Sequence, residues 1–196
     1  MERLKQEDKK RNKSMRVLDQ TPIQQTKNWI HKVVIGCNFC PFAAKAMNIS
    51  EGVHFDLLDP SDETPFDEYL EQQFIQLDNQ SSVETSFIIF SDLGIDFESF
   101  LGIVDLANEV LILKDLEGIY QFASFHPEYC FEGVESDDPS NYTNRSIYPM
   151  LQILRETSIS KVRETYPDIE SIPDRNIEYA RTKGLDAMLA LRASCI

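Results

Sequence analysis

The chain lacks long apolar runs and any sign of an export signal. No stretch approaches the roughly 18 consecutive apolar residues that a membrane-spanning helix needs. The first sixteen residues are charged, and no apolar segment follows them as it would in a secretory signal. We therefore expect a cytoplasmic protein with no membrane contact.

Cysteine is also scarce, since Cys37, Cys40, Cys130 and Cys195 are the only four in 196 residues. So few, unevenly spaced cysteines do not indicate a disulfide framework in a chain that is long enough to build its own hydrophobic core. We expect free thiols, unless a metal binds them.

Positive charge is missing from a long part of the chain. Between Lys45 and Lys114 there is no Lys or Arg, whereas that interval holds fifteen of the 33 Asp and Glu, and the net charge is −14. A nucleic-acid binder needs a basic surface to displace counterions from phosphates, so we expect no nucleic-acid partner. The first sixteen residues are basic, with seven Lys and Arg against three acids. We interpret residues 1–20 as a flexible basic N-terminal arm and residues 21–196 as a single α/β domain.

Apolar spacing and capping residues predict the order of helices and strands. A helix over residues 21–35 begins with Thr21 as its N-cap residue and Pro22 at its first helical position, and it stops at Gly36. A second helix should begin at Pro41, which makes Cys40 its N-cap residue. Strands are predicted over residues 53–58, 86–91 and 119–125. Further helices are predicted over residues 65–77, 97–113, 147–165 and 174–192. Gly184 should weaken the last of these helices.

The alternation of strands and helices predicts an α/β fold with a small, mainly parallel sheet of about three strands, covered by helices. Residues 86–91 form a continuous apolar run and should be the central strand. Ligands of such sheets bind outside the carboxyl ends of the strands, and these ends are Asp59, Asp92 and His126. The connection over residues 127–146 is long for a structureless loop, which favours a functional segment.

The segment over residues 125–150 gathers the side chains most suited to chemistry. His126 is a candidate general acid or base, although a single histidine is more commonly bonded to nearby backbone. Arg145 lies close to the predicted start of a helix and is a candidate anion binder, the alternative being an ion pair with acids of the loop. The candidate ligand-binding residues beside Arg145 are Tyr129, Asn141 and Asn144, and the loop acids are Glu135, Asp137 and Asp138.

The thiols allow three interpretations. If Cys40 caps a helix, unpaired backbone N–H groups and the helix dipole favour its thiolate, so Cys40 or Cys130 is a candidate catalytic nucleophile. The alternative is that Cys37 and Cys40 are simply small buried residues. A third interpretation takes Cys37, Cys40, His126 and Cys130 as the four ligands of a zinc ion, because C-x2-C is followed much later by H-x3-C.

Four segments carry a resemblance to a known family: CPFA over residues 40–43, ASFHPEYCFEG over residues 123–133, NYTNRSIYPML over residues 141–151, and IPDRNI over residues 172–177. With these segments the chain resembles the bacterial family known as domain of unknown function 1415, from about residue 22 to about residue 192. The resemblance implies no reaction. Members of that family often have an apolar residue at the position of Cys37, which favours a site built on Cys40, His126, Cys130 and Arg145 over the four-ligand zinc site.

Three functional hypotheses remain open on the sequence. The first is a pocket that acts on or binds a small anionic molecule, as an enzyme or as a binder, with Arg145 holding the anion. The second is a metal-binding module with zinc or another thiolate-bound metal. The third is a non-catalytic domain whose acidic surface engages a basic protein partner. The sequence decides neither the cofactor nor the oligomeric state.

Overall fold

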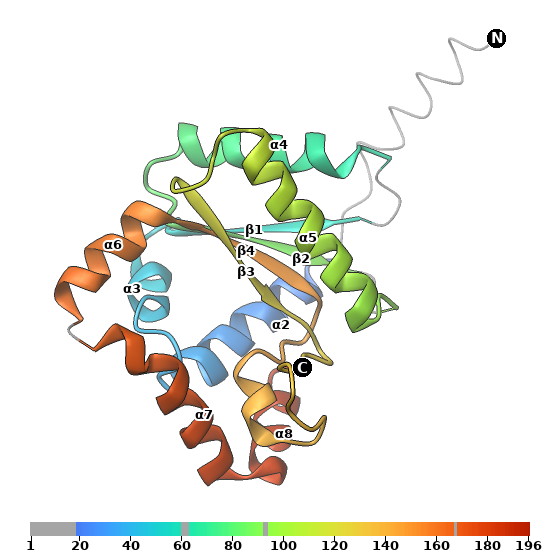
Figure 1. Ribbon diagram of the computed structural model, residues 1–196, viewed down its shortest axis with the longest axis vertical. Coiled ribbons are helices and arrows are strands. Elements are labelled where there is room, and N and C mark those ends of the chain that lie inside the picture. The colour runs from blue at the N-terminus through green and yellow to red at the C-terminus, as the bar shows by residue number, and fades with distance from the viewer. Residues whose placement is uncertain (1–18, 60–62, 92–93, 167) are drawn as a thin grey trace.

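A computed structural model describes residues 19–196 apart from 60–62, 92–93 and 167 (Figure 1). The basic arm predicted over residues 1–20 therefore falls almost entirely outside the described residues. The longer helices are α2 (Thr21–Trp29), α3 (Ala43–Asn48), α4 (Phe66–Asn79), α5 (Phe97–Leu113), α6 (Glu156–Thr165), α7 (Ile172–Lys183) and α8 (Leu185–Ala193). The π-helix η1 (Ile30–Ile35) continues α2, and short 3-10 helices form η2 (Pro139–Thr143) and η3 (Ile169–Ser171). Within the described part of the chain, no helix has the length and apolar character needed to cross a membrane.

The first predicted helix is confirmed, since α2 and η1 together span residues 21–35. Pro22 lies in the first turn, but the N-cap residue is Gln20 rather than Thr21. The helix ends before Gly36, where the chain passes very close to the preceding turn: a Cβ atom at Gly36 would lie 2.2 Å from the carbonyl oxygen of Lys32. A side chain at this position would have to push the backbone apart.

The strands are β1 (Val53–Leu58), β2 (Thr85–Phe90), β3 (Tyr120–Phe125) and β4 (Met150–Arg155), and they form one sheet in the order β1-β2-β4-β3. The strand β1 is parallel to β2, whereas β4 is antiparallel to both β2 and β3. The α/β class is confirmed, but the sheet is mixed and four-stranded rather than mainly parallel with about three strands.

The missing strand β4 lies where the helix over residues 147–165 was predicted to begin, and the observed helix α6 starts only at Glu156. The run from Met150 to Arg155 is short and apolar, so its periodicity does not distinguish a strand from a buried helix. Its backbone is bonded on both sides, to β2 and to β3, because it enters the sheet between them. Tertiary pairing therefore decided its structure.

The strands β1, β2 and β3 point in one direction, because β4 is antiparallel to both of its neighbours. Their carboxyl ends consequently share one edge of the sheet, as predicted. Asp59 and His126 follow β1 and β3 at this edge. Asp92, the third residue predicted there, lies outside the described residues. Phe125 pairs with Met150, so the chain leaves β3 and enters β4 at this same edge.

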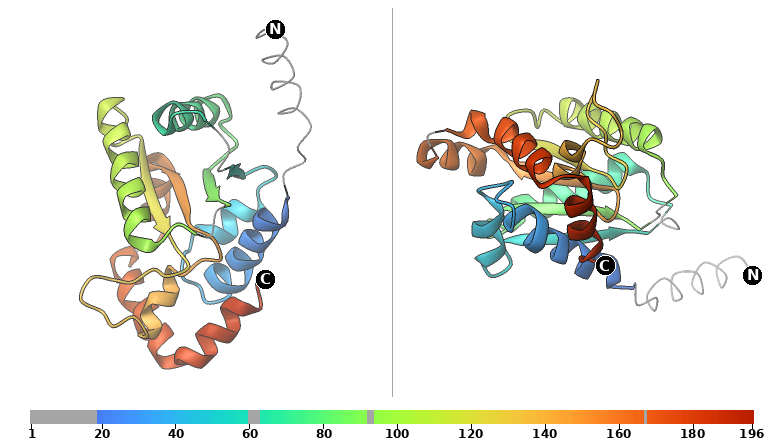
Figure 2. Two further views of the ribbon diagram at one scale, coloured as in Figure 1. Left: turned by 90° about the vertical axis from the view of Figure 1, so that its right-hand side faces the viewer. Right: turned by 90° about the horizontal axis from the view of Figure 1, so that it is seen from below.

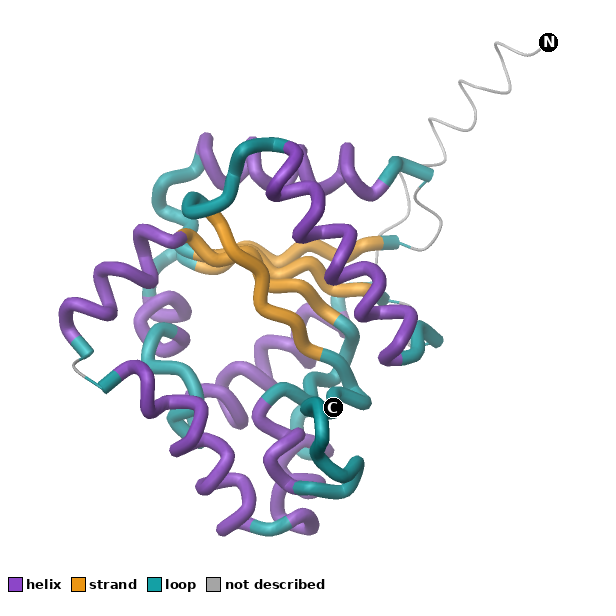
Figure 3. Tube along the Cα trace, in the orientation of Figure 1, coloured by secondary structure: helices purple, strands orange, loops and turns teal. Residues whose placement is uncertain are grey.

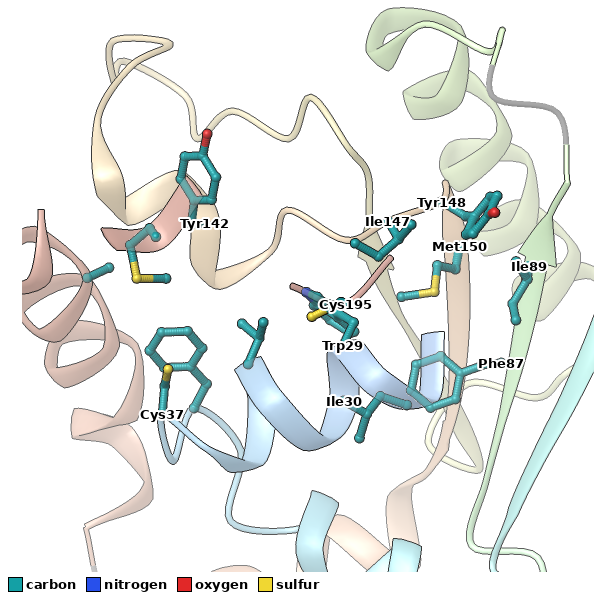
Figure 4. Packing of buried hydrophobic residues seen from close by; sticks show 14 of the residues in the cluster. Trp29, Ile30, Cys37, Phe87, Ile89, Tyr142, Ile147, Tyr148, Met150 and Cys195 are labelled. Carbon is teal, nitrogen blue, oxygen red and sulfur yellow. The ribbon is translucent and has the colours of Figure 1, made fainter. Parts of the chain in front are cut away.

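Helices cover both faces of the sheet (Figure 2). Side chains alternate along β2, so that Ile88 and Phe90 pack under α4 and α5, whereas Phe87 and Ile89 pack against α2 and η1. The core on the α2 side also contains residues of the C-terminal helices and of the segment after β3. Figure 4 labels members of it that come from distant parts of the sequence: Trp29, Ile30, Cys37, Phe87, Ile89, Tyr142, Ile147, Tyr148, Met150 and Cys195.

The helix predicted over residues 174–192 is divided at Gly184 into α7 and α8. Gly184 has φ 81°, in the left-handed region that glycine adopts at little cost. The break turns α8 back, so that both helices pack against η2 while α8 also packs against η1. The C-terminal helices thus hold the long connection between β3 and β4.

Candidate functional site

The connection over residues 126–146 appears in Figure 3 as a loop that leaves β3, makes the short helix η2 and returns to β4. We name it the 126–146 loop. It contains every residue predicted to bind a ligand, together with two of the three candidate catalytic residues, His126 and Cys130. The hydrogen bonds of these side chains determine which of them is available to a ligand.

Two asparagine side chains make hydrogen bonds within the loop. Asn141 is fully buried, and its Oδ1 accepts the backbone N–H of Phe131 at 3.0 Å while its Nδ2 donates to the carbonyl oxygen of Glu135 at 2.9 Å. Asn144 accepts the hydroxyl of Thr143 on its side chain at 3.1 Å, and its carbonyl oxygen accepts the backbone N–H of His126 at 3.3 Å. Both side chains have structural partners, which explains how a long connection without regular structure stays ordered.

His126 is also held in place by packing and hydrogen bonds. It is 2% exposed, and its ring lies 5.3 Å from the ring of Phe97 and 5.2 Å from that of Phe100, measured between centroids. The backbone N–H of Glu128 donates to Nδ1 at 3.0 Å, and Nε2 lies 2.9 Å from the carbonyl oxygen of Ile95. The acceptor role of Nδ1 places the ring proton on Nε2. Burial lowers the pKa of His126, so the neutral ring is favoured.

Arg145 joins the two ends of the loop. Its Nε donates to the carbonyl oxygen of Tyr129 at 2.9 Å, and its Nη2 donates to that of Ser136 at 2.7 Å. Its guanidinium carbon lies 4.9 Å from the centre of the Tyr142 ring, a cation–π arrangement. The expected alternative, an ion pair between Arg145 and the loop acids, is wrong for Asp138, which pairs instead with Arg181 at 2.9 Å.

Asp138 illustrates how the loop is fastened to α7. The Arg181 guanidinium and the backbone N–H of Ser140 hold the pKa of the Asp138 carboxyl well below its usual range. The Arg181 side chain is 52% exposed and that of Asp138 is 23% exposed, so solvent screens the pair and its contribution to stability is small.

The aromatic and thiol side chains of the loop pack on one another and on its backbone. Tyr129 is half-buried, with its ring 5.3 Å from Phe97 and 5.0 Å from Phe131. Burial raises the pKa of Tyr129, and the neighbouring Cys130 raises it further. The Cys130 thiol donates to the carbonyl oxygen of Val134 at 3.3 Å.

Cys40 lies before α3, which begins at Ala43 with Phe42 as its N-cap residue, two residues later than predicted. The backbone N–H groups of Phe42 and Ala43 face the Cys40 sulfur, as a helix start was expected to provide. Burial nevertheless raises the pKa of Cys40, because it outweighs these two bonds. The expectation that this position favours the thiolate is therefore wrong.

The structure does not bring the four proposed zinc ligands together. Among the residues that the structure describes, no three His, Cys, Asp or Glu side chains are placed to hold a metal ion together. The proposed zinc ligands have separate surroundings, since Cys37 bonds to the hydroxyl of Tyr179, His126 to the carbonyl oxygen of Ile95, and Cys130 to that of Val134. Burial raises the pKa of Cys37, while the Tyr179 bond and the charge of Lys183 oppose it.

Sequence reasoning missed several residues that hold the site. The indole N–H of Trp29 donates to the carbonyl oxygen of Arg145 at 3.1 Å, and Nε of Arg192 donates to that of Ser146 at 2.8 Å. On α7, Asn176 donates to the carbonyl oxygen of Phe39 at 2.7 Å. No local pattern marks Trp29 or Arg192, whereas Asn176 belongs to the segment over residues 172–177 that carried the family resemblance.

A second polar cluster lies between β1 and α4, on the face of the sheet that α4 and α5 cover. Asp56, an acid inside β1, accepts hydrogen bonds from the Tyr69 hydroxyl and the Gln73 amide, both at 2.6 Å. Gln73 in turn accepts the Ser86 hydroxyl at 3.4 Å. The only signal in the sequence is an Asp within an otherwise apolar strand. All these groups satisfy one another, so the cluster fastens α4 to the sheet.

The described residues also line a shallow, open hollow along α7, formed by Asp174, Ile177, Glu178, Arg181 and Thr182. It contains none of the candidate site residues. The hollow therefore does not support the ligand pocket predicted at the strand ends.

These features define a mixed α/β protein in which a hydrogen-bonded polar loop follows the carboxyl edge of the sheet. The chain belongs to the family described as Protein of unknown function (DUF1415), whose model matches residues 21–190 and so confirms the resemblance found in the sequence. No curated protein and no solved structure matches the chain.

Proposed function

We propose that the protein binds a small anionic molecule at Arg145, on the outer side of the 126–146 loop. The observation that carries the proposal is the set of partners that Arg145 has. Its guanidinium is half-buried, yet all the hydrogen-bond acceptors it contacts among the described residues are neutral carbonyl groups. Within the same part of the chain it takes part in no ion pair.

The charge of the chain makes this arrangement informative. Acids outnumber bases by 33 to 19, and the 126–146 loop itself carries Glu135, Asp137 and Asp138. A guanidinium with a purely structural role has carboxylates within the same loop to pair with, as Arg181 pairs with Asp138. Carbonyl groups orient Arg145 without cancelling its charge, which leaves an oriented cation available to an anion.

The donor geometry supports the same proposal. Nε and Nη2 of Arg145 are bonded, whereas Nη1 has no partner among the described residues. A guanidinium fixed on one side and free on the other loses little rotamer freedom when it binds a ligand. The catalytic roles of His126, Cys40 and Cys130 stay predictions, and both ring nitrogens of His126 would first have to leave their present partners.

A thermal-shift experiment tests the binding proposal. Acetate, sulfate and inorganic phosphate would each be added at one ionic strength, with sodium chloride as the balancing salt. At least one of the three should raise the melting temperature of the full chain, and Arg145→Gln should remove that shift. The matched control is Arg163→Gln, which removes the same charge from an exposed position on α6.

The ligand-induced shift is compared within each variant, because Arg145→Gln also loses two bonds that hold the loop. The proposal is overturned if none of the three anions changes the melting temperature of the wild-type protein. An anion shift that survives unchanged in Arg145→Gln would overturn it as well.

A further inference from the structure

A second arginine bonds to the residue that follows Arg145. Arg192, on α8, is half-buried and donates from Nε to the carbonyl oxygen of Ser146, the residue that follows Arg145. Burial lowers the pKa of Arg192, the nearby positive charge of Arg145 also lowers it, and Tyr142 opposes both. An arginine remains charged under such shifts, and the bond to Ser146 brings this second cation to the end of the 126–146 loop.

Neither cation is neutralised by the protein. Arg192, like Arg145, makes no ion pair within the described residues. By contrast, Arg181 of α7 forms an ion pair with Asp138 of the 126–146 loop at 2.9 Å. Two like charges that act on each other without a neutralising carboxylate repel, and an anion bound by both would relieve that repulsion.

Each of the two side chains keeps donors without a partner among the described residues. Arg192 uses only Nε, so its Nη1 and Nη2 have no partner in the part of the chain that the structure describes. Arg145 contributes Nη1, and its guanidinium is held over the ring of Tyr142 at 4.9 Å. Packing of α8 against η2 and η1 brings the second side chain to the loop. Two separately anchored guanidinium groups can bond to different oxygens of one tetrahedral anion.

We propose that Arg145 and Arg192 form a clamp for the dianionic phosphate group of a small soluble phosphomonoester. This inference rests on the proposed function and adds the class of ligand to it. A single guanidinium suffices for a monoanion such as a carboxylate. Two guanidinium groups match both the charge and the number of oxygens of a phosphate with one ester bond.

The experiment compares two probes that differ in charge and little else. At pH 8, methyl phosphate is a dianion, whereas dimethyl phosphate carries one negative charge. Calorimetric titration of the full chain should give at least tenfold tighter binding for methyl phosphate. Arg192→Gln should reduce that preference to about threefold or less, while Arg163→Gln should keep it. Arg192→Lys, which retains the charge but not the planar fork, should fall between them.

Each result separates the clamp from the proposed function. Equal binding of the two probes, with Arg192→Gln behaving as wild type and Arg145→Gln losing affinity, overturns the clamp and leaves anion binding at Arg145 intact. No binding of either probe overturns the clamp, and the acetate and sulfate shifts then decide the proposed function. A methyl phosphate preference that survives both Arg145→Gln and Arg192→Gln places the anion elsewhere and overturns both proposals. Melting curves establish that each variant is folded, and Arg192→Lys serves if Arg192→Gln is not.

Discussion

Replacing Asn141 tests whether the 126–146 loop is held together from inside. In Asn141→Ala, the backbone N–H of Phe131 loses its acceptor, and the carbonyl oxygens of Glu135 and Ser136 lose a shared donor. An unsatisfied buried polar group costs about 1–3 kcal/mol. Glu135 and Ser136 are exposed residues, so water can reach their carbonyl groups, and most of the loss comes from Phe131 and from the space left by the amide. We expect destabilisation of about 2–4 kcal/mol.

Asn141→Asp makes the test sharper, because it keeps the shape of the side chain. One carboxylate oxygen can still accept the N–H of Phe131, but the other replaces a donor and faces the carbonyl oxygens of Glu135 and Ser136. Burial and these oxygens should raise the pKa of the new carboxyl above about 3.9, its value in an unfolded chain. The protonated form is then the stable one, so the Asp variant should lose stability relative to the Ala variant as the pH rises through the raised pKa.

Urea unfolding followed by circular dichroism measures both effects. The control is Asn108→Ala, because Asn108 is exposed on α5 and bonds only to the carbonyl oxygen of Val104 in its own helix. Its free energy of unfolding should change by about 0.5 kcal/mol or less. If Asn141→Ala costs no more than this control, the amide does not organise the loop. A pH-independent difference between the Asp and Ala variants would refute the proposed orientation of the amide.

Two further predictions follow from the pKa shifts. Since burial lowers the pKa of His126 below its ordinary 6.5, the unfolded chain binds its proton first as the pH falls, and stability that is present above pH 6.5 should decline below it. His126→Gln should flatten this part of the urea-measured stability curve, and an unchanged slope would contradict the buried neutral ring. Burial raises the pKa values of Cys37, Cys40 and Cys195, so mass spectrometry should find all three alkylated more slowly by iodoacetamide at pH 7 than a free cysteine. Rapid labelling of Cys40 would instead favour its predicted nucleophilic role.

Local sequence signals predicted most elements of the fold. The strand at residues 53–58 and the helix at residues 97–113 match the observed β1 and α5. These two elements could be predicted because residues close together in the sequence determine both a strand bounded by turn residues and a helix with one apolar stripe. The same applies to Gly36, where the close approach of the helix backbone requires glycine.

The long connection after β3 was located from the sequence, but the partners of its side chains were not predictable. Asn141 bonds to residues five to ten positions earlier, and their distance depends on how the loop folds back. Cys40 does lie at a helix start, yet the degree of its burial depends on what packs over it, and burial decides the direction of its pKa shift. Arg192 lies 46 residues after its bonded partner Ser146, and it reaches the loop only because the chain turns at Gly184.

By itself, the sequence determined the α/β class, the positions of the first three strands, and the edge of the sheet at which His126 emerges. Periodicity and turn chemistry act between near neighbours, so one chain is sufficient to reveal them. Only the tertiary structure decided that residues 150–155 form an inserted antiparallel strand, and that Arg192 of α8 bonds to Ser146, the residue after Arg145. Pairing between distant strands, burial, and the charge that surrounds a side chain depend on segments far apart in sequence, and these meet only when the chain folds.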